Sequence, residues 1–146
     1  ILDKIPEDMD IELNVSCPNT DKHMVNDGLK PFLNNKRKWC IVKLSPLETH
    51  YNIDKFYESG FRQFHASNTL PSERGGISGS ILKPYTLSTI TYLKNNFKDC
   101  IVIAGGGIYN IKTMEEYKKA GADHVSVSTL FFNPIRTFSF FSSIYF

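Results

Sequence analysis

The sequence predicts an α/β fold in which helices cover a parallel β-sheet. Short apolar segments rich in β-branched residues alternate along the chain with longer segments of helical periodicity, which is the pattern of βα units. The later apolar segments are hydrophobic on both faces, as buried parallel strands are. With 146 residues, of which 41% are hydrophobic and 22% charged, the chain has the size and composition of one folded domain.

Five segments have the length and composition of strands, and each is followed by small or polar residues. In chain order they are residues 10–15, 39–44, 61–66, 100–104 and 124–128. Apolar runs this short are typical of strands rather than helices. We therefore expect five parallel strands.

Three segments between these strands carry apolar residues at helical spacing. Residues 47–59 end at Gly60, residues 84–97 follow a glycine-rich turn, and residues 111–120 end at Gly121. A glycine directly after a periodic segment is a common helix stop, because it adopts the left-handed conformation at little cost. The sequence predicts a helix in each segment.

Two segments fit this alternation less well. Residues 21–38 are polar and predict a loop followed by a short helix. Residues 130–146 contain seven Phe or Tyr and one charge, Arg136. Because a closing barrel helix usually has a charged outer face, we predict an atypical aromatic tail at 130–146 within a single domain, 1–146.

Five units are too few to close an eight-stranded barrel, which needs about 250 residues. By length, the chain is either a TIM (β/α)8 barrel without its first three units or a five-stranded open sheet. The sequence opens at Ile1 without Met or a signal-peptide pattern, which predicts that it is part of a longer protein.

Composition argues against several functions. A net charge of +2 without a long basic block gives no indication of nucleic acid as a partner. No apolar run approaches the roughly 20 residues of a membrane span. The three cysteines, Cys17, Cys40 and Cys100, have no CxxC spacing, so we expect neither a zinc site nor a disulfide framework. This use of cysteine predicts a reducing compartment, the cytoplasm.

Polar residues follow all five predicted strands. They fall in segments 14–19, 43–46, 67–79, 105–107 and 126–129. Because the carboxyl ends of parallel strands meet at one edge of the sheet, these residues predict a ligand site there. The glycines at 105–107 and the hydroxyl groups at 126–129 favour a phosphate-bearing ligand, although glycines alone also form simple tight turns.

Lys43 is a stronger indication of function, because a lysine in an otherwise apolar strand is costly unless its charge is used or paired. Cys17 at a strand end is either an inert buried thiol or a reactive one. His65 and His124 lie in or beside predicted strands without matching acidic residues, so we expect structural roles for them. No His, Asp or Glu set has metal-ligand spacing.

Several of these segments, in order, resemble the dihydroorotate dehydrogenase family. The matching motifs are LNVSCPNT at 13–20, VKL at 42–44, SNT at 67–69, GGISG at 75–79, IAGGGI at 103–108, GA at 121–122 and ST at 128–129. The resemblance covers roughly residues 10–132. It implies a TIM barrel that binds FMN at its C-terminal mouth, with this chain supplying strands four to eight.

The resemblance also implies roles at the reacting centre. Cys17 matches the base that removes a proton from C5 of dihydroorotate while hydride passes from C6 to the flavin, and cysteine there is typical of the soluble class. A thiol suits this role because its reference pKa of about 8.5 is near neutrality. Amides suit a pyrimidine edge, because they both donate and accept hydrogen bonds. The matching substrate-binding residues are Asn14, Asn19, Asn68 and Thr69.

The remaining matches concern the cofactor. Lys43 matches the residue beside the flavin pyrimidine ring, where its charge would stabilise the anion formed on reduction. Ser67 and Gly79 match positions lining the flavin. The residues that match the phosphate-binding positions are Gly106, Gly107, Ser128 and Thr129. In the complete protein the resemblance implies a homodimer acting in pyrimidine biosynthesis on the small molecules dihydroorotate and orotate.

Two other functions remain open. A dihydropyrimidine dehydrogenase-like flavin domain would share the barrel and the cysteine, but it is expected to come with an iron–sulfur apparatus for which this chain has too few cysteines. A half-barrel could also be a non-catalytic remnant or an interaction module, since five strands leave sheet edges unpaired.

Overall fold

The computed structural model describes residues 4–15, 28–67, 69–73 and 75–145. Five parallel strands form one sheet in the order β1-β2-β3-β6-β7. Their bounds are β1 (Ile11–Asn14), β2 (Cys40–Lys43), β3 (Gln63–Ala66), β6 (Ile101–Gly105) and β7 (His124–Ser126). All five strands predicted from the sequence are present, each within a few residues of its expected ends.

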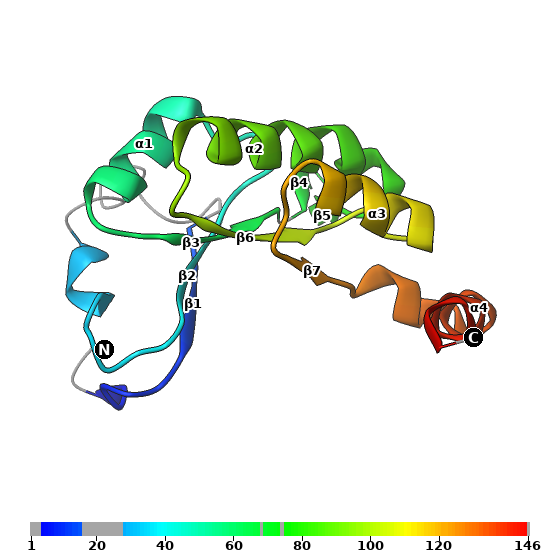
Figure 1. Cartoon of the computed structure of the whole chain (residues 1–146), viewed down its shortest axis with the longest axis horizontal. Helices are drawn as coiled ribbons and strands as arrows, with labels where there is room; N and C mark the ends of the chain where they lie inside the picture. Colours follow the sequence, from blue (N-terminus) through cyan, green and yellow to red (C-terminus); the bar gives the residue numbers. More distant parts are fainter. Residues whose placement is uncertain (1–3, 16–27, 68, 74, 146) are drawn as a thin grey trace.

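Helices α1 (His50–Glu58), α2 (Lys83–Asn96) and α3 (Ile111–Lys119) lie together on one face of the sheet (Figure 1). They coincide with the three predicted helices. Thr49 and Asn110 begin α1 and α3 by accepting hydrogen bonds from the backbone N–H groups of Asn52 and Thr113, at 3.2 and 2.9 Å. Such caps satisfy backbone donors that have no partner within the helix.

The core lies between these helices and the sheet. Val42, Phe64 and Val102 lie on neighbouring strands and are completely buried. Helices α1 and α2 contribute buried residues to the same cluster, among them Phe56 and Leu93. This packing explains why the strands are continuously apolar on the face that the helices cover.

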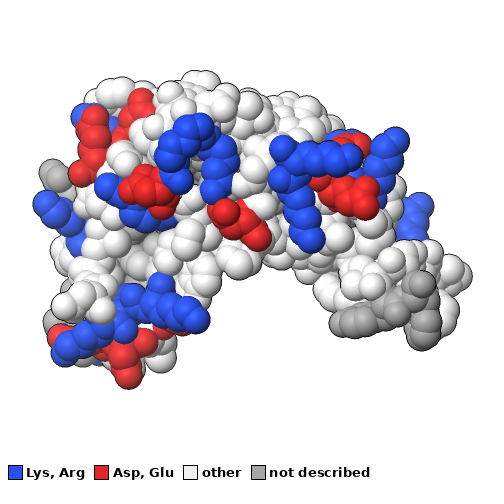
Figure 2. Space-filling view, viewed as in Figure 1, with Lys and Arg blue, Asp and Glu red and all other residues white. Residues whose placement is uncertain are grey.

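The opposite face of the sheet is concave, and helices α1, α2 and α3 leave it uncovered (Figure 1). Figure 2 shows the hollow that this arrangement leaves beneath the sheet. Strand residues that point to this face include Glu12, Lys43 and Ile103, which alternate with the core residues. In a closed barrel this face would be the interior.

The structure adds elements that the sequence analysis did not predict. Strands β4 (Leu70–Ser72) and β5 (Gly75–Ile77) form a separate antiparallel pair. The region predicted as an aromatic tail contains a 3₁₀ turn, η5 (Thr129–Phe132), followed by helix α4 (Pro134–Tyr145). The expected short helix before β2 is the 3₁₀ turn η3 (Lys30–Phe32).

Helix α4 has no charged outer face and still docks on the body of the protein. Phe140 is 6% exposed and belongs to the core cluster, whereas Phe132 and Phe138, on the chain around it, are largely exposed. The helix begins at a proline, and Asn133 accepts the backbone N–H of Arg136 at 3.1 Å. A proline in the first turn and an Asn cap are strong start signals, so they explain a helix despite the aromatic composition.

None of the helices in the described ranges is both long and apolar enough to cross a bilayer.

Candidate functional site

The strand register brings most of the predicted polar residues to one edge of the sheet. Asn14 lies opposite Lys43, and Lys43 lies opposite His65 on the next strand. At the other end of the strand order, Gly105 on β6 lies opposite Ser126 on β7. Residues more than 100 positions apart in the chain therefore share the carboxyl edge, where parallel α/β folds place their ligands.

Lys43 is held by an acidic residue that the sequence analysis missed. Its Nζ donates a 3.0 Å hydrogen bond to Oε1 of Glu12 on β1. The other carboxylate oxygen of Glu12 lies 2.7 Å from Nδ1 of His65, which is 7% exposed. Glu12 thus joins three adjacent strands by their side chains.

This contact corrects the prediction that His65 has no acidic partner. Glu12 and His65 are 53 residues apart, and only the β1-β2-β3 order aligns them. The available signal was that Glu12 lies two positions before Asn14 in a strand, and hence on the same face. Burial raises the pKa of Glu12, but hydrogen bonds from His65 and Lys43 outweigh this and lower it below its ordinary value.

Gly105 makes room for the His65 ring. A Cβ atom added at Gly105 would lie 2.3 Å from Nε2 of His65, closer than any real contact. The first glycine of the 105–107 turn therefore serves the packing of the charged cluster, whereas Gly106 and Gly107 have φ values of +78° and +73° and form the turn itself.

Ser67, predicted to line the flavin, is buried in the structure. It is 5% exposed, and its Oγ is 3.1 Å from Oγ1 of Thr86 on α2. Thr86 in turn donates to the carbonyl of Gly105 at 3.0 Å. These bonds tie the end of β3 to the start of the glycine turn.

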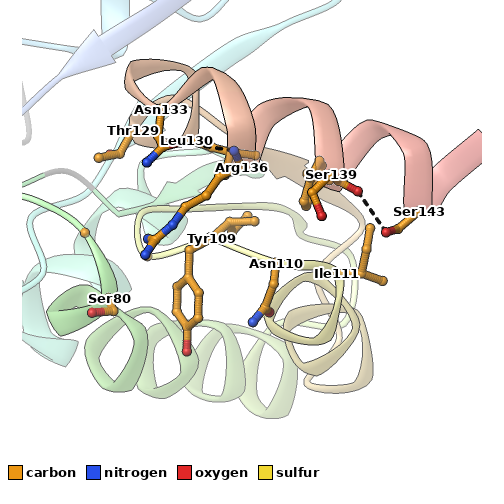
Figure 3. Close-up of a pocket in the computed structure, with 14 residues that line it drawn as sticks. Ser80, Tyr109, Asn110, Ile111, Thr129, Leu130, Asn133, Arg136, Ser139 and Ser143 are labelled. Carbon is orange, nitrogen blue, oxygen red and sulfur yellow. Dashed lines mark hydrogen bonds between the residues drawn. The ribbon is translucent and has the colours of Figure 1, made fainter.

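The glycine turn borders a pocket of about 610 Å³ between α3 and α4 (Figure 3). Three residues predicted to bind the cofactor line it, Gly79, Gly107 and Thr129. Gly106 and Ser128 are next to them in the chain but are not among the lining residues. The structure therefore brings the turn after β6 and the turn after β7 to one cavity.

Tyr117 fixes the turn from the α3 side. Its hydroxyl donates a 2.8 Å hydrogen bond to the carbonyl of Gly106. Burial raises the pKa of Tyr117 to about 12, so the hydroxyl keeps its proton and remains a donor. A Cβ at Gly107 would approach this hydroxyl to 3.3 Å and the carbonyl of Gly79 to 3.2 Å, so a side chain there would crowd the turn.

The sequence analysis also missed the pocket's contribution from α4. Asn133, Arg136 and Ser139 line the wall opposite the glycine turn. Arg136 is the single charged residue among the lining residues. The sequence marked it only as the one charge of the aromatic segment.

A second cavity, of about 500 Å³, lies on the concave face. Glu12, Ile41 and Ile103 line it, together with Trp39 and His124, whose rings make an edge-to-face contact at 5.6 Å. The ring contact fits the structural role predicted for His124. Among the described residues, no group of three His, Cys, Asp or Glu side chains could hold a metal ion.

Three predicted site residues, Cys17, Asn19 and Asn68, lie outside the described residues. Of the other two substrate candidates, Asn14 ends β1 and Thr69 lies against the β4–β5 pair, where a Cβ at Gly76 would meet its Oγ1 at 2.3 Å.

The two described cysteines are unlike reactive thiols. Cys40 and Cys100 are buried, and burial raises both pKa values, that of Cys100 to about 11. At neutral pH these thiols are protonated and unreactive.

Comparison with known proteins supports the resemblance. A sequence model of the family described as dihydroorotate dehydrogenase matches residues 2–140. Two similar curated proteins are named dihydroorotate dehydrogenase B (NAD(+)), catalytic subunit, from Thermotoga petrophila and Thermotoga maritima; both are 46% identical over 146 residues, covering 85% of this chain and 54% of theirs. A protein of the same name from Oceanobacillus iheyensis is 32% identical, covering 85% of this chain and 49% of its own length.

Solved structures agree on the fold. Ligand-free DHODH from Eimeria tenella matches with a TM-score of 0.69 and 22% identity, covering 91% of this chain and 49% of that one. DHODH from the same organism in complex with ferulenol gives 0.68, with 84% and 45% covered. The chain spans about half the length of the relatives it matches. The prediction of a partial TIM barrel is confirmed. The five parallel strands correspond to part of such a barrel.

Proposed function

Because the chain belongs to the dihydroorotate dehydrogenase family, we propose that it forms the half of an FMN enzyme that binds the cofactor and oxidises dihydroorotate to orotate. The observation that carries this proposal is the arrangement at the carboxyl edge of the sheet. A lysine held by a carboxylate lies at one end of that edge, and a glycine-lined pocket lies at the other.

The pocket suits the phosphate end of FMN. Its lining combines Gly79 and Gly107, whose backbones carry no side chain that would keep a ligand away, with the hydroxyl of Thr129. A Cβ at Gly79 would meet nothing within 4 Å, so there is open space at this backbone. Backbone N–H groups and hydroxyls are the neutral donors that phosphate sites of barrels use.

When bound, FMN supplies the chemistry of the reaction by accepting the hydride from C6 of dihydroorotate. Lys43 would then face the pyrimidine end of the flavin and stabilise the negative charge that reduction creates. The 3.0 Å hydrogen bond from Lys43 Nζ to Glu12 Oε1 already holds the ammonium group in place, so Lys43 does not have to become ordered during the reaction. Asn14 on the adjacent strand, with Asn19, Asn68 and Thr69, would bind the substrate through amide and hydroxyl hydrogen bonds.

Cys17 would act as the general base for the proton on C5. The described cysteines cannot take this role, since Cys40 and Cys100 are buried with raised pKa values. In the sequence Cys17 comes three residues after Asn14, the last residue of β1, so this proposal rests on its motif.

The relatives' names support a proposal for the electron acceptor. Three similar curated proteins carry the name dihydroorotate dehydrogenase B (NAD(+)), catalytic subunit. We infer that NAD⁺ would be the electron acceptor of the complete enzyme and that a partner subunit would supply its binding site. The complete protein would be a cytoplasmic homodimer of the flavin-binding chain together with that partner.

Anaerobic reduction of the bound flavin tests the proposal. The protein expressed from its whole reading frame should be purified with FMN, and dihydroorotate should bleach the oxidised flavin spectrum. Dihydrouracil is the matched control substrate and should leave it unchanged; bleaching by dihydrouracil instead would favour a dihydropyrimidine dehydrogenase-like activity. A purified protein that neither retains nor binds FMN would be a non-catalytic half-barrel.

A further inference from the structure

The wall of the 610 Å³ pocket that α4 provides is not accounted for by the resemblance. Asn133, directly before α4, and Arg136 and Ser139 within it are spaced three residues apart and line the same pocket. Across the cavity lie Ser80, Tyr109 and the start of α3 at Ile111 (Figure 3), and Gly79 and Gly107 also line the pocket. The pocket is therefore lined by two kinds of surface, a glycine backbone on one side and polar helix side chains on the other.

Arg136 gives this pocket its charge. No Asp or Glu lines it, and Figure 3 shows the Arg136 side chain extending from α4 across the pocket towards Tyr109. Lys83, at the start of α2, is paired instead with Glu116 on α3. Within the described ranges, no carboxylate forms an ion pair with Arg136.

An exposed guanidinium group at a pocket whose other lining residues are uncharged favours an anion. Its planar N–H groups match two oxygens of a phosphate at once, and charge-assisted hydrogen bonds of this kind are about twice as strong as neutral ones. The remaining polar lining, which includes Thr129 and Ser139, can complete the hydrogen bonds of a phosphate dianion. A carboxylate lining would have cancelled this preference.

We propose that Arg136 is a phosphate-binding residue that completes the FMN site from the α4 side. The inference rests on the proposed function and adds to it a residue from the aromatic segment at 130–146. It makes α4 part of the cofactor site, so this helix contributes specificity for FMN over riboflavin as well as packing.

Titration of the flavin-free protein with FMN and with riboflavin tests the inference, with flavin fluorescence as the readout. The protein is expressed from its whole reading frame. Arg136→Gln should weaken FMN binding on the order of 10- to 100-fold, as expected for the loss of a hydrogen bond to a charged group. It should leave riboflavin binding unchanged, because riboflavin lacks the phosphate. Raising the salt concentration should weaken FMN binding to the wild type more than to the variant.

Two further variants separate charge from structure. Arg136→Lys keeps the charge and should recover part of the FMN affinity. Lys112→Gln removes an exposed cation of α3 that does not line the pocket, and it should have no effect on either flavin. Inorganic phosphate should compete with FMN for the wild type and compete less well for Arg136→Gln.

The outcomes distinguish this inference from the function on which it rests. If wild type and Arg136→Gln bind FMN with equal affinity, Arg136 is a surface residue and the inference is wrong while the proposed function stands. If Arg136→Gln weakens FMN and riboflavin equally, the variant has disturbed the pocket and the phosphate contact is refuted. If the wild type binds neither flavin, the proposed function itself fails.

Discussion

Glu12 shows how one residue can organise a site. It accepts hydrogen bonds from Lys43 and from the nearly buried His65, so its charge is matched on two sides. Its pKa is lowered, which means that the folded protein favours the ionised form. A group of this kind stabilises the fold above its ordinary pKa and loses that contribution as the pH falls through the lowered value.

Replacing Glu12 by Gln should therefore destabilise the protein at neutral pH. We expect a loss on the order of 1 kcal/mol, because the carboxylate is partly exposed and solvent screens the pair. The difference from wild type should vanish well below pH 4.5, the ordinary value for Glu, where the wild-type carboxyl is also neutral. Urea unfolding across a pH series measures this. Glu7→Gln, in an exposed pair with Lys36, is the control and should change little.

The proposed base gives a second prediction at the same scale. Cys17→Ser keeps the approximate shape but raises the intrinsic pKa by several units, so proton removal should slow by a factor on the order of 10² to 10⁴. Flavin content and orotate binding should barely change. Stopped-flow bleaching of the flavin by dihydroorotate, followed against pH, is the measurement. Equal rates at neutral pH would make Cys17 a structural thiol.

At the scale of elements, the packing of β6 against β3 depends on Gly105. Gly105→Ala should destabilise the protein by about 1–3 kcal/mol, the usual cost of overpacking, because its methyl group would collide with His65. In a His65→Ala background the same change should cost less, since the colliding ring is gone. Equal costs in both backgrounds, measured by denaturant unfolding, would refute this account of the glycine.

Helix α4 gives the second prediction about an element. Phe140→Ala should cost about 3 kcal/mol, as expected for removing a buried aromatic ring from a core. Phe132→Ala, at a side chain that is 88% exposed, should cost little. Thermal or urea unfolding of the two variants distinguishes them. Similar effects would mean that α4 does not dock as described.

At the scale of the whole molecule, the described sheet has two edges and an uncovered concave face. Each of β1 and β7 has one neighbour in the described sheet, and α4 exposes Ile135 and Phe138 beside it. Unpaired strand edges and exposed apolar surface favour association. We predict that the isolated 146-residue chain self-associates or unfolds easily in sedimentation and melting experiments. A monomer that unfolds cooperatively at high temperature would show that the half-barrel is stable alone.

Local patterns in the sequence were enough to predict the alternation of strands and helices and the parallel sheet, and the family resemblance then favoured a partial barrel over an open sheet. Strand length, helical spacing and a glycine after a helix are properties of neighbouring residues, so each can be recognised without the fold. The ordered motifs around Asn14, Lys43 and Gly107 were equally local, and the family assignment followed from them. The sequence therefore determined the architecture and the edge of the sheet at which we propose the site.

Only the tertiary structure decided which side chains meet. Glu12 reaches Lys43 and His65 because three strands pair in one register. Arg136 and Gly107 line one pocket because α4 packs beside α3. The sequence analysis did not predict helix α4, because it judged the segment by its lack of a charged, solvent-facing side. The helix is stabilised instead by its start at Asn133 and Pro134 and by the burial of Phe140. Contacts between distant segments depend on register and docking, and no spacing within one segment encodes them.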